Sequence, residues 1–417
     1  MGISYETVDK APSGLITREP PYRGWVSVVR RDAWRRWSLV TTGVGLLCLS
    51  PVVIGAWPAA DPGVDPGRLR DEVAASAPRP YQGYIESTGH IDMPDLPQIG
   101  DVTKLLGGTI RIRAWYATPT AWRVAVLTPT GEQDTYRAGG ATFIWDYERN
   151  LLTGISGELP IRLPWASDLT PPELARRLLS AAATDPVSHL PARRVAGMTA
   201  AGFRITPQDA ASTIGRVDVW ADPRTGLPVQ IDVGARDEAR AVFSTRFLDL
   251  RQQPPVREVI TPRRPQGASV TTTDAPDVAA ALNSIATFPL PAVLAGRTRA
   301  EPASPIAGVG TYGTGLSTFV AVPLPGRFGG RAIDAAERAN AVPVQFDVGQ
   351  GLELRTSILT TLVEWQGEWP SQQAFLLAGF VTPDLLRAAG AELLDAADLG
   401  RGLDRPPPGA TDTGAAP

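Results

Sequence analysis

Residues 96–150 constrain the fold more than any other part of the chain, because their apolar and polar side chains alternate with a period of two. Two such runs, 110–116 and 122–127, are separated by Ala-Thr-Pro-Thr, and a third, 141–147, follows an Ala-Gly-Gly turn. This pattern predicts short antiparallel strands. One face groups Trp115 with arginines and Leu127 with Arg123, so it is aromatic as well as charged. Such a sheet needs helices on one side and a ligand, or more helices, on the other.

The composition favours a globular protein without a nucleic-acid partner. A chain of 417 residues with 43% hydrophobic content can bury a large core and is expected to form about two domains. The net charge of −3 provides no basic surface for nonspecific nucleic-acid binding. The only cysteine, Cys48, lies in an apolar segment, so no intramolecular disulfide can form.

Residues 37–57 form an uncharged segment long enough to cross a bilayer as a helix, with a tryptophan at each end. Four arginines precede it and Asp61 and Asp65 follow it, which predicts a cytoplasmic N-terminus. A cleaved signal peptide is the alternative, but the preceding polar region is long and no clean A-x-A site follows. We therefore expect a cytoplasmic tail (1–36), an uncleaved single-pass transmembrane helix (37–57) in the cell membrane, and an extracytoplasmic remainder.

The first outer domain is expected at 79–251, after a tether at 58–78 that begins with a Pro/Asp/Gly-rich spacer. A helix is predicted with Thr170 as N-cap, Pro171 at the first helical position and Glu173 closing a capping box. Strands are predicted after this helix at 193–198, 201–206, 215–221, 227–233 and 239–250, with a turn at 222–226. Helices combined with antiparallel hairpins indicate an α+β domain.

The C-terminal part is expected to form a smaller α+β domain at 290–396, after a Pro-rich linker and a helix (277–287) within 252–289. Strands are predicted at 316–322, 342–348, 352–365 and 374–381, and a helix opened by Thr382 at 383–394. The tail, 397–417, is expected to be disordered.

The chain shows no catalytic constellation. Its two histidines, His90 and His189, have no partners at metal-ligand spacing, and no nucleophile motif occurs. Residues 308–313 match G-x-G-x-x-G, but a strand-like sequence follows, so a glycine-rich turn is favoured over a dinucleotide site. Two acidic pairs have nothing to distinguish them from surface charges: Glu132 with Asp134, and Glu364 with Glu368. We expect no enzyme activity, no metal and no cofactor.

Tryptophans are concentrated in the first outer domain. Most of them are expected to pack the core, but some are candidates for lining an apolar cavity closed by the helix at 170–184. The candidate lining residues are Trp115, Trp122, Trp145, Trp165, Trp220, Leu174 and Leu178. Arg111, Arg113 and Arg123 are candidates for contacting an anionic headgroup at the rim, although arginines on a solvated strand face are more common.

The order of several motifs resembles actinobacterial proteins of the LolA/RseB superfamily. These motifs are W-R-V-x-x-L, D-x-Y-R-x-G, L-T-P-P-E-L-A, V-A-G, V-x-V-x-x-D-P-x-T-G-L-P-V and F-S-T-R-F, within about residues 80–250. The segments GLSTFVAVPLP, GLELRTSILTTLVEW and FLLAGFVTPDLLRAAGAELL are similar to the second domain of RseB-like regulators.

The resemblance implies an antiparallel half-barrel wrapped around helices, with an apolar concave side. In LolA this cavity carries lipoprotein acyl chains, whereas RseB binds an anti-sigma factor and senses envelope lipid. The resemblance therefore implies a membrane-anchored binding protein for a lipid, acyl chain or lipoprotein. The alternative is an RseB-like negative regulator that binds an anti-sigma factor in the envelope stress response.

Overall fold

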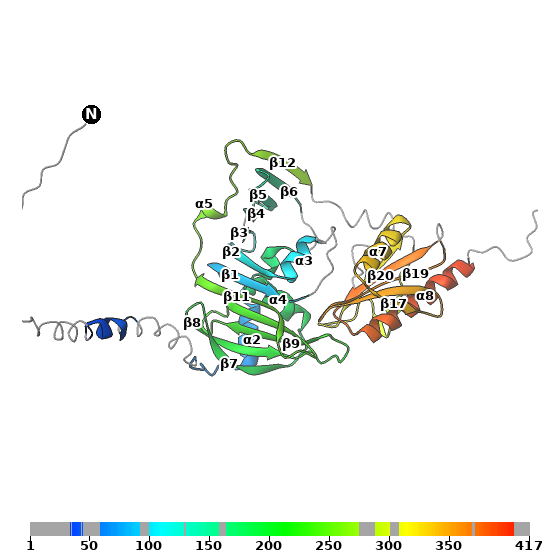
Figure 1. Cartoon of the computed structure of the whole chain (residues 1–417), viewed down its shortest axis with the longest axis horizontal. Coiled ribbons are helices and arrows are strands. Elements are labelled where there is room, and N and C mark those ends of the chain that lie inside the picture. The colour runs from blue at the N-terminus through cyan, green and yellow to red at the C-terminus, as the bar shows by residue number, and fades with distance from the viewer. Residues whose placement is uncertain are drawn as a thin grey trace, which may run out of the picture. The chain divides into compact units, whose positions relative to one another are not determined.

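The computed structural model describes residues 34, 36–42, 44, 59–91, 100–128, 131–157, 164–274, 288–300, 308–368 and 372–403 (Figure 1). The chain divides into two units, Met1–Trp57 and Pro58–Pro417. In the first, only residues 34, 36–42 and 44 are described, and they are helical. Within the described residues, no helix combines the length and apolar character needed to span a bilayer. Of the expected 37–57 span, residues 43 and 45–57 lie outside them.

The first sheet has twelve strands in the order β12-β6-β5-β4-β3-β2-β1-β11-β10-β9-β8-β7. Their bounds are β1 Tyr81–Gly89, β2 Thr109–Thr118, β3 Ala121–Leu127, β4 Glu132–Ala138, β5 Ala141–Asp146, β6 Leu151–Ser156, β7 Val187–Val195, β8 Met198–Ile205, β9 Ile214–Ala221, β10 Pro228–Ala235, β11 Ala241–Arg251 and β12 Ser269–Asp274. All neighbours are antiparallel except β12, which pairs parallel with β6. This large, mainly antiparallel sheet fits the predicted α+β class, and among the described strands it does not close, because β12 and β7 are its two edges.

The helices of the first sheet are α2 Pro66–Ala74, α3 Gly100–Leu106, η1 Ala166–Leu169 and α4 Pro171–Ala181. Asp65 caps α2 by accepting a hydrogen bond from the Arg68 backbone N–H (2.9 Å). Leu69 and Val73 of α2 are fully buried in the core that α4 shares with the strands. The expected 58–78 tether therefore contains a helix that belongs to this core.

The start of α4 follows the prediction only in part. Thr170 is the N-cap and Pro171 the first helical residue, but the capping box predicted with Glu173 is wrong. The Thr170 hydroxyl donates to the Ser167 carbonyl instead (3.0 Å), because η1 directly precedes α4 and places that carbonyl within reach. A reciprocal contact occurs one turn earlier, where the Trp165 backbone N–H donates to Asp168 Oδ2 (2.8 Å).

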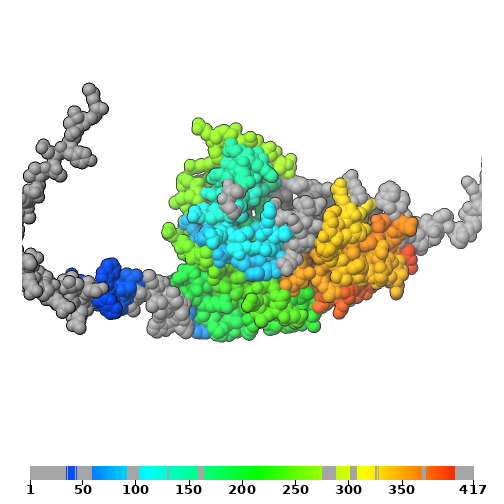
Figure 2. Space-filling view, viewed as in Figure 1, coloured from blue at the N-terminus to red at the C-terminus, as the bar shows by residue number. Residues whose placement is uncertain are grey.

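The residues after β11 pack against the first sheet and then add its edge strand, β12. Residues 252–274, expected within a linker, contain α5 Arg257–Ile260 and β12. Ile260 is buried, and α5 contacts β2, β3 and β4. Figure 2 shows the yellow-green surface of this part of the chain beside the teal surface of β4–β6. The helix expected at 277–287 lies outside the described residues.

The second sheet has six strands in the order β15-β16-β20-β19-β18-β17. Their bounds, with those of the accompanying hairpin and helices, are β13 Val293–Leu294, β14 Arg297–Thr298, β15 Gly310–Tyr312, β16 Phe319–Pro325, α7 Arg327–Arg338, β17 Val342–Gln345, β18 Gln350–Arg355, β19 Thr360–Gln366, β20 Gln373–Gly379 and α8 Pro383–Leu403. The strand predicted at 352–365 is wrong as one element, since residues 356–359 form a turn between β18 and β19. The α8 helix buries Leu386 and Leu393 against one face of this sheet. α7 contacts the opposite face, where Gly329 approaches Ala374.

Residues 206–213 connect the two sheets through hydrogen bonds. The Ser212 hydroxyl donates to the Leu316 carbonyl (2.8 Å), and Asp209 binds Arg297 (2.5 Å) and the Ser317 hydroxyl (2.5 Å). The hydrogen bond from Arg297 is the largest cause that lowers the pKa of Asp209 to about 2. Asp209 is therefore ionised across the physiological range, so its ion pair with Arg297, which links the two sheets, persists there.

Candidate functional site

The register of β2 and β3 separates two faces of the first sheet. Ile112, Ala114 and Tyr116 of β2 are buried on the face that packs against the helices, which we call the helix-side face. Tyr116 is paired with Trp122 across the strands, so Trp122 is on the same face. The alternate residues of both strands, including Trp115 and its partner Arg123, lie on the outer face.

A cavity of about 310 Å³ lies between β1–β3 on the helix-side face and the residues of η1 and α4. Tyr81 and Tyr116 form its aromatic wall, with ring centroids 5.0 Å apart and planes inclined by 8°. The Tyr116 hydroxyl donates to the Ala77 carbonyl (2.8 Å). Burial raises the pKa of both tyrosines, so both remain neutral. The complete lining is Ala77, Tyr81, Tyr116, Pro119, Trp122, Val124, Ser167, Asp168, Thr170, Glu173, Arg176 and Arg177.

Four charged side chains on η1 and α4 form the polar part of this cavity. Glu173 accepts hydrogen bonds from Arg176 Nη2 (2.6 Å) and Arg177 Nε (2.9 Å). Arg177 also donates to Asp168 Oδ1 (2.9 Å). The Arg176 guanidinium lies 6.0 Å from the centre of the Tyr116 ring, so a cation borders the aromatic wall. The cavity thus combines an apolar surface with a charged edge.

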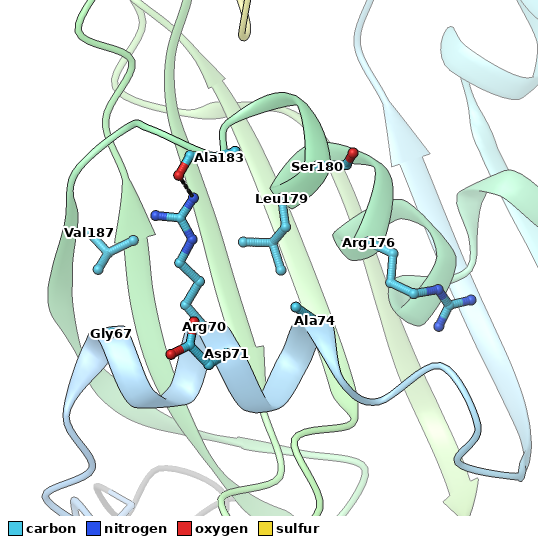
Figure 3. A pocket seen from close by; sticks show the side chains of 9 residues that line it. All are labelled: Gly67, Arg70, Asp71, Ala74, Arg176, Leu179, Ser180, Ala183 and Val187. Carbon is cyan, nitrogen blue, oxygen red and sulfur yellow. Dashed lines mark hydrogen bonds between the residues drawn. The ribbon is translucent and has the colours of Figure 1, made fainter.

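A groove of about 560 Å³ lies between α2 and α4 and is lined by Gly67, Arg70, Asp71, Ala74, Arg176, Leu179, Ser180, Ala183 and Val187 (Figure 3). Figure 3 shows Arg70 crossing from α2 to the end of α4, where it donates to the carbonyls of Ala182 (2.5 Å), Ala183 (2.7 Å) and Asp185 (3.0 Å). These bonds satisfy carbonyls that the end of a helix leaves without partners. Arg176 lines both the groove and the aromatic cavity, so the two hollows adjoin at this residue.

On the outer face, Arg123 belongs to a compact charge cluster and not to the rim of a cavity. Arg123 Nη2 binds Asp134 Oδ2 (2.8 Å) and Glu132 Oε1 (3.1 Å), and its guanidinium lies over the rings of Trp115 (4.7 Å) and Tyr136 (5.3 Å). Burial is the main cause that raises the pKa of Asp134 to about 6. This cluster lies next to the residues of α5.

The seven residues that the sequence suggested as a cavity lining lie at different places in the structure. Of the seven, Trp122 alone lines the aromatic cavity. Leu174 and Leu178 are half-buried against the first core, and Trp165 is half-buried at the start of η1. The register places Trp115, Trp145 and Trp220 on the outer face.

The three candidate rim arginines also lie on the outer face. Arg111 and Arg113 are exposed, and Arg113 lies 5.9 Å from the centre of the Tyr84 ring. Arg123 is half-buried in the charge cluster. None of them lines the aromatic cavity or the groove, so contact with a headgroup there would require other cations.

The cavity residues that the sequence analysis did not select come from separate elements. Tyr81 and Tyr116 lie on β1 and β2, and Arg176 and Arg177 on α4. Tyr116 could have been selected, because it is in phase with the apolar residues Ile110 and Ile112. The two arginines follow Glu173 at spacings of three and four, which indicates only surface ion pairs on a helix.

The other motifs considered from the sequence have structural roles. Residues 308–313 form β15 and a turn into β16, with Gly313 at φ 85°, so the helix that a dinucleotide site needs is replaced by a strand. Glu132 and Asp134 share Arg123. Glu364 is fully buried whereas Glu368 is exposed, so they do not form an acid pair.

No family model and no curated protein matches this chain. Among solved structures it is similar to MucB in complex with MucA(peri), with TM-score 0.44, 15% identity and coverage of 78% of this chain and 97% of the other. It is also similar to a chain of the Pseudomonas aeruginosa MucA/MucB complex (0.44, 16%, 77% and 96%) and to a LolA superfamily protein from Nitrosomonas europaea (0.24, 11%, 48% and 99%). These neighbours are MucB and a LolA superfamily protein. Their TM-scores lie below 0.5, so these likenesses carry no conclusion about the function of this chain.

Proposed function

We propose that this protein is a non-catalytic binding protein that holds an acyl chain or lipid in the hollow beside α4. The aromatic cavity carries the proposal: Tyr81, Tyr116 and Trp122 line it, and the Tyr116 hydroxyl is bound to a protein carbonyl. Small-molecule sites are mostly apolar hollows of about 300–1,000 Å³ with a few polar groups. A volume of about 310 Å³ with charged residues at one edge fits that description.

The proposed setting is the outer surface of the cell membrane, with residues 37–57 as the anchor. In the described part of this segment, Trp37 and Leu39 are helical and more than 70% exposed, as expected for side chains that face lipid. We expect the full-length protein to stay with the membrane fraction after an alkaline carbonate wash. Recovery in the soluble fraction would contradict the anchor but not the binding function.

Trp122 and Trp115 provide a matched test of the binding function, because both are half-buried on adjacent strands but lie on opposite faces. Full-length protein, purified in an amphipathic polymer, is extracted with organic solvent and its lipids are measured by mass spectrometry. We expect acyl lipid in the wild type, a reduction of at least about fivefold in Trp122→Ala because a cavity wall is lost, and little change in Trp115→Ala. Wild-type protein without lipid, or equal losses in both variants, would contradict the proposal.

A protein-binding function is the second candidate, and the C-terminal sheet favours it. No described residue of this sheet lines the cavity or the groove, so it contributes nothing to holding a ligand there. The sheet is nevertheless fixed to the first one through Asp209 and Ser212. The MucB structure contains MucA(peri), and a role for this chain as a regulator that binds an anti-sigma factor would use such a second module. A membrane protein that co-purifies with the wild type and is lost on deleting residues 290–417 would support it.

A further inference from the structure

We infer that the ligand is a single-chain anionic amphiphile whose carboxylate or phosphate group binds Arg176, at the junction of the aromatic cavity and the groove. The inference rests on the proposed function and adds the chemical class of the ligand and the residue that selects it. The two hollows supply the apolar surface, and Arg176 is the cation that lines both.

Arg176 is half-buried and has unused hydrogen-bonding capacity. Its side chain is only 18% exposed, yet among the described residues it donates a single hydrogen bond, from Nη2 to Glu173 Oε2. A guanidinium has five N–H donors in a planar fork that matches the oxygens of a carboxylate or phosphate. Its remaining donors are therefore available to an anionic group seated in the cavity, and hydrogen bonds between a guanidinium and an anion are stronger than neutral ones.

The other arginines near the helices are already engaged. Arg70 donates to three carbonyls at the end of α4, and Arg177 binds both Glu173 and Asp168 while 54% of its side chain is exposed. Glu173 is shared between Arg176 and Arg177, so Arg176 holds only part of its hydrogen-bonding capacity. Asp168 is occupied by Arg177 and by the Trp165 backbone N–H. Arg176 is thus the cation that can accept a further anion with least rearrangement.

The size and position of the hollows favour one chain over two. A volume of about 310 Å³ is at the lower end of small-molecule sites, so the cavity holds one apolar group against the rings of Tyr81 and Tyr116. The groove continues from Arg176 along α2 and α4, over Leu179, Ala183 and Val187 (Figure 3). In Figure 3 the Arg176 guanidinium points away from the other residues of the groove, and it lies beside Tyr116, so a single chain with its acid group at Arg176 fits the aromatic cavity, whereas two chains side by side exceed it.

The test compares octanoate, octyl phosphate and octanol, which share one chain length and differ in the head group. Each is titrated calorimetrically into the full-length protein in an amphipathic polymer, for the wild type, Arg176→Gln, Arg176→Lys and Arg113→Gln. Arg113 is exposed on the outer face and serves as the matched control. Because all four proteins carry the same polymer, partition of the probes into it cancels between them.

We expect the wild type to bind at least one of the two anions at least about tenfold more tightly than octanol, and Arg176→Gln to lose that preference while keeping its affinity for octanol. Arg176→Lys should retain part of it, and Arg113→Gln all of it. The anion that is preferred identifies a carboxylate or a phosphate. Equal wild-type binding of all three probes, or an anion preference that survives Arg176→Gln, overturns the inference and leaves the proposed function standing. Binding of none of them contradicts the proposed function itself.

Discussion

Replacing Glu364 with glutamine is expected to stabilise the protein at pH 7, by about 1.4 kcal/mol for each pH unit by which the folded-state pKa of this carboxyl exceeds its unfolded value, although the substitution adds no contact. Glu364 lies on β19 and faces α8, where a Cβ at Gly390 would collide with its carboxyl group. The side chain is fully buried, and neither carboxyl oxygen has a hydrogen-bond partner among the described residues. An ionised carboxylate in such a place is strongly disfavoured, and burial raises the pKa of Glu364 well above its usual range.

The groups that face Glu364 do not offset its charge. Gln366, on the same side of β19, donates to the Leu394 carbonyl. On the neighbouring strand, Glu353 is the nearest acid on this face, and Arg387 of α8 is bound to it (2.9 Å). No cation among the described residues is paired with Glu364, so nothing offsets the effect of burial, which favours the protonated carboxyl.

The sign of the pH dependence follows from this protonation. Because the folded-state pKa is raised above the unfolded value of 4.5, folding binds a proton between these two values. Glu364 therefore makes the free energy of unfolding fall by about 1.4 kcal/mol for each pH unit above 4.5, until the folded-state pKa is reached. Glutamine has the same shape and no such dependence, so the two proteins should differ little at pH 4.

Urea denaturation of full-length protein at pH 4, 5, 6 and 7 measures the difference. The matched control is Glu337→Gln, since Glu337 is exposed on α7, and this variant should follow the wild type within about 0.5 kcal/mol. Parallel pH profiles for the wild type and Glu364→Gln would show that the carboxyl is solvated or paired, contrary to the structure.

The sequence predicted the elements whose pattern is local. The strands at 201–206, 215–221, 227–233 and 239–250 and the turn at 222–226 were predicted close to their observed positions, because alternation and turn residues act over a few residues. The strand predicted at 193–198 is wrong as one element, because it spans the turn at 196–197 between β7 and β8. β4 was missed, because its sequence E-Q-D-T-Y-R-A buries a carboxylate, Asp134, where an apolar residue is expected. α7 was missed because two consecutive glycines near its start weaken the helical signal.

The site was less predictable because it depends on which face each strand turns toward the helices. The alternation correctly grouped Trp115 with the arginines, but only the packing of α4 shows that this group lies on the opposite side from the cavity. The cavity wall joins Tyr81 to Tyr116, 35 residues apart, and this contact depends on strand pairing that no local pattern contains. Arg176 was not selected because its position beside Tyr116 depends on the same packing.

Replacing Arg123 with methionine is expected to destabilise the protein by about 3–5 kcal/mol at pH 8, because it leaves a buried carboxylate without its counter-ion. Asp134 has a fully buried side chain that accepts hydrogen bonds from Arg123 (2.8 Å) and from the Tyr136 hydroxyl (3.0 Å). Arg123 also lies over Trp115, so methionine, which is unbranched and apolar, retains part of the packing and isolates the loss of charge.

The pH dependence of Arg123→Met distinguishes a lost counter-ion from lost packing. The pKa of Asp134 is raised to about 6 by burial even though Arg123 lowers it, so without Arg123 it rises further. A raised folded-state pKa means stability that is present at low pH and lost as pH increases, and the variant continues to lose it above pH 6. The deficit should therefore shrink at pH 5, and adding Asp134→Asn should recover part of it at pH 8. If the loss of stability in Arg123→Met did not depend on pH, it would be due to lost packing alone.

The same variant decides between the two roles considered for Arg123. As a headgroup contact at a cavity rim, Arg123 would affect ligand binding more than stability. In the structure it is on the outer face, and the aromatic cavity is on the helix-side face, so Arg123→Met should bind the anionic octyl probes as the wild type does when both are folded at pH 5. Arg111→Met, exposed on the outer face, is the control and should change stability by less than about 0.5 kcal/mol. Weakened binding without a loss of stability would restore the rim role and contradict the assignment of anion recognition to Arg176.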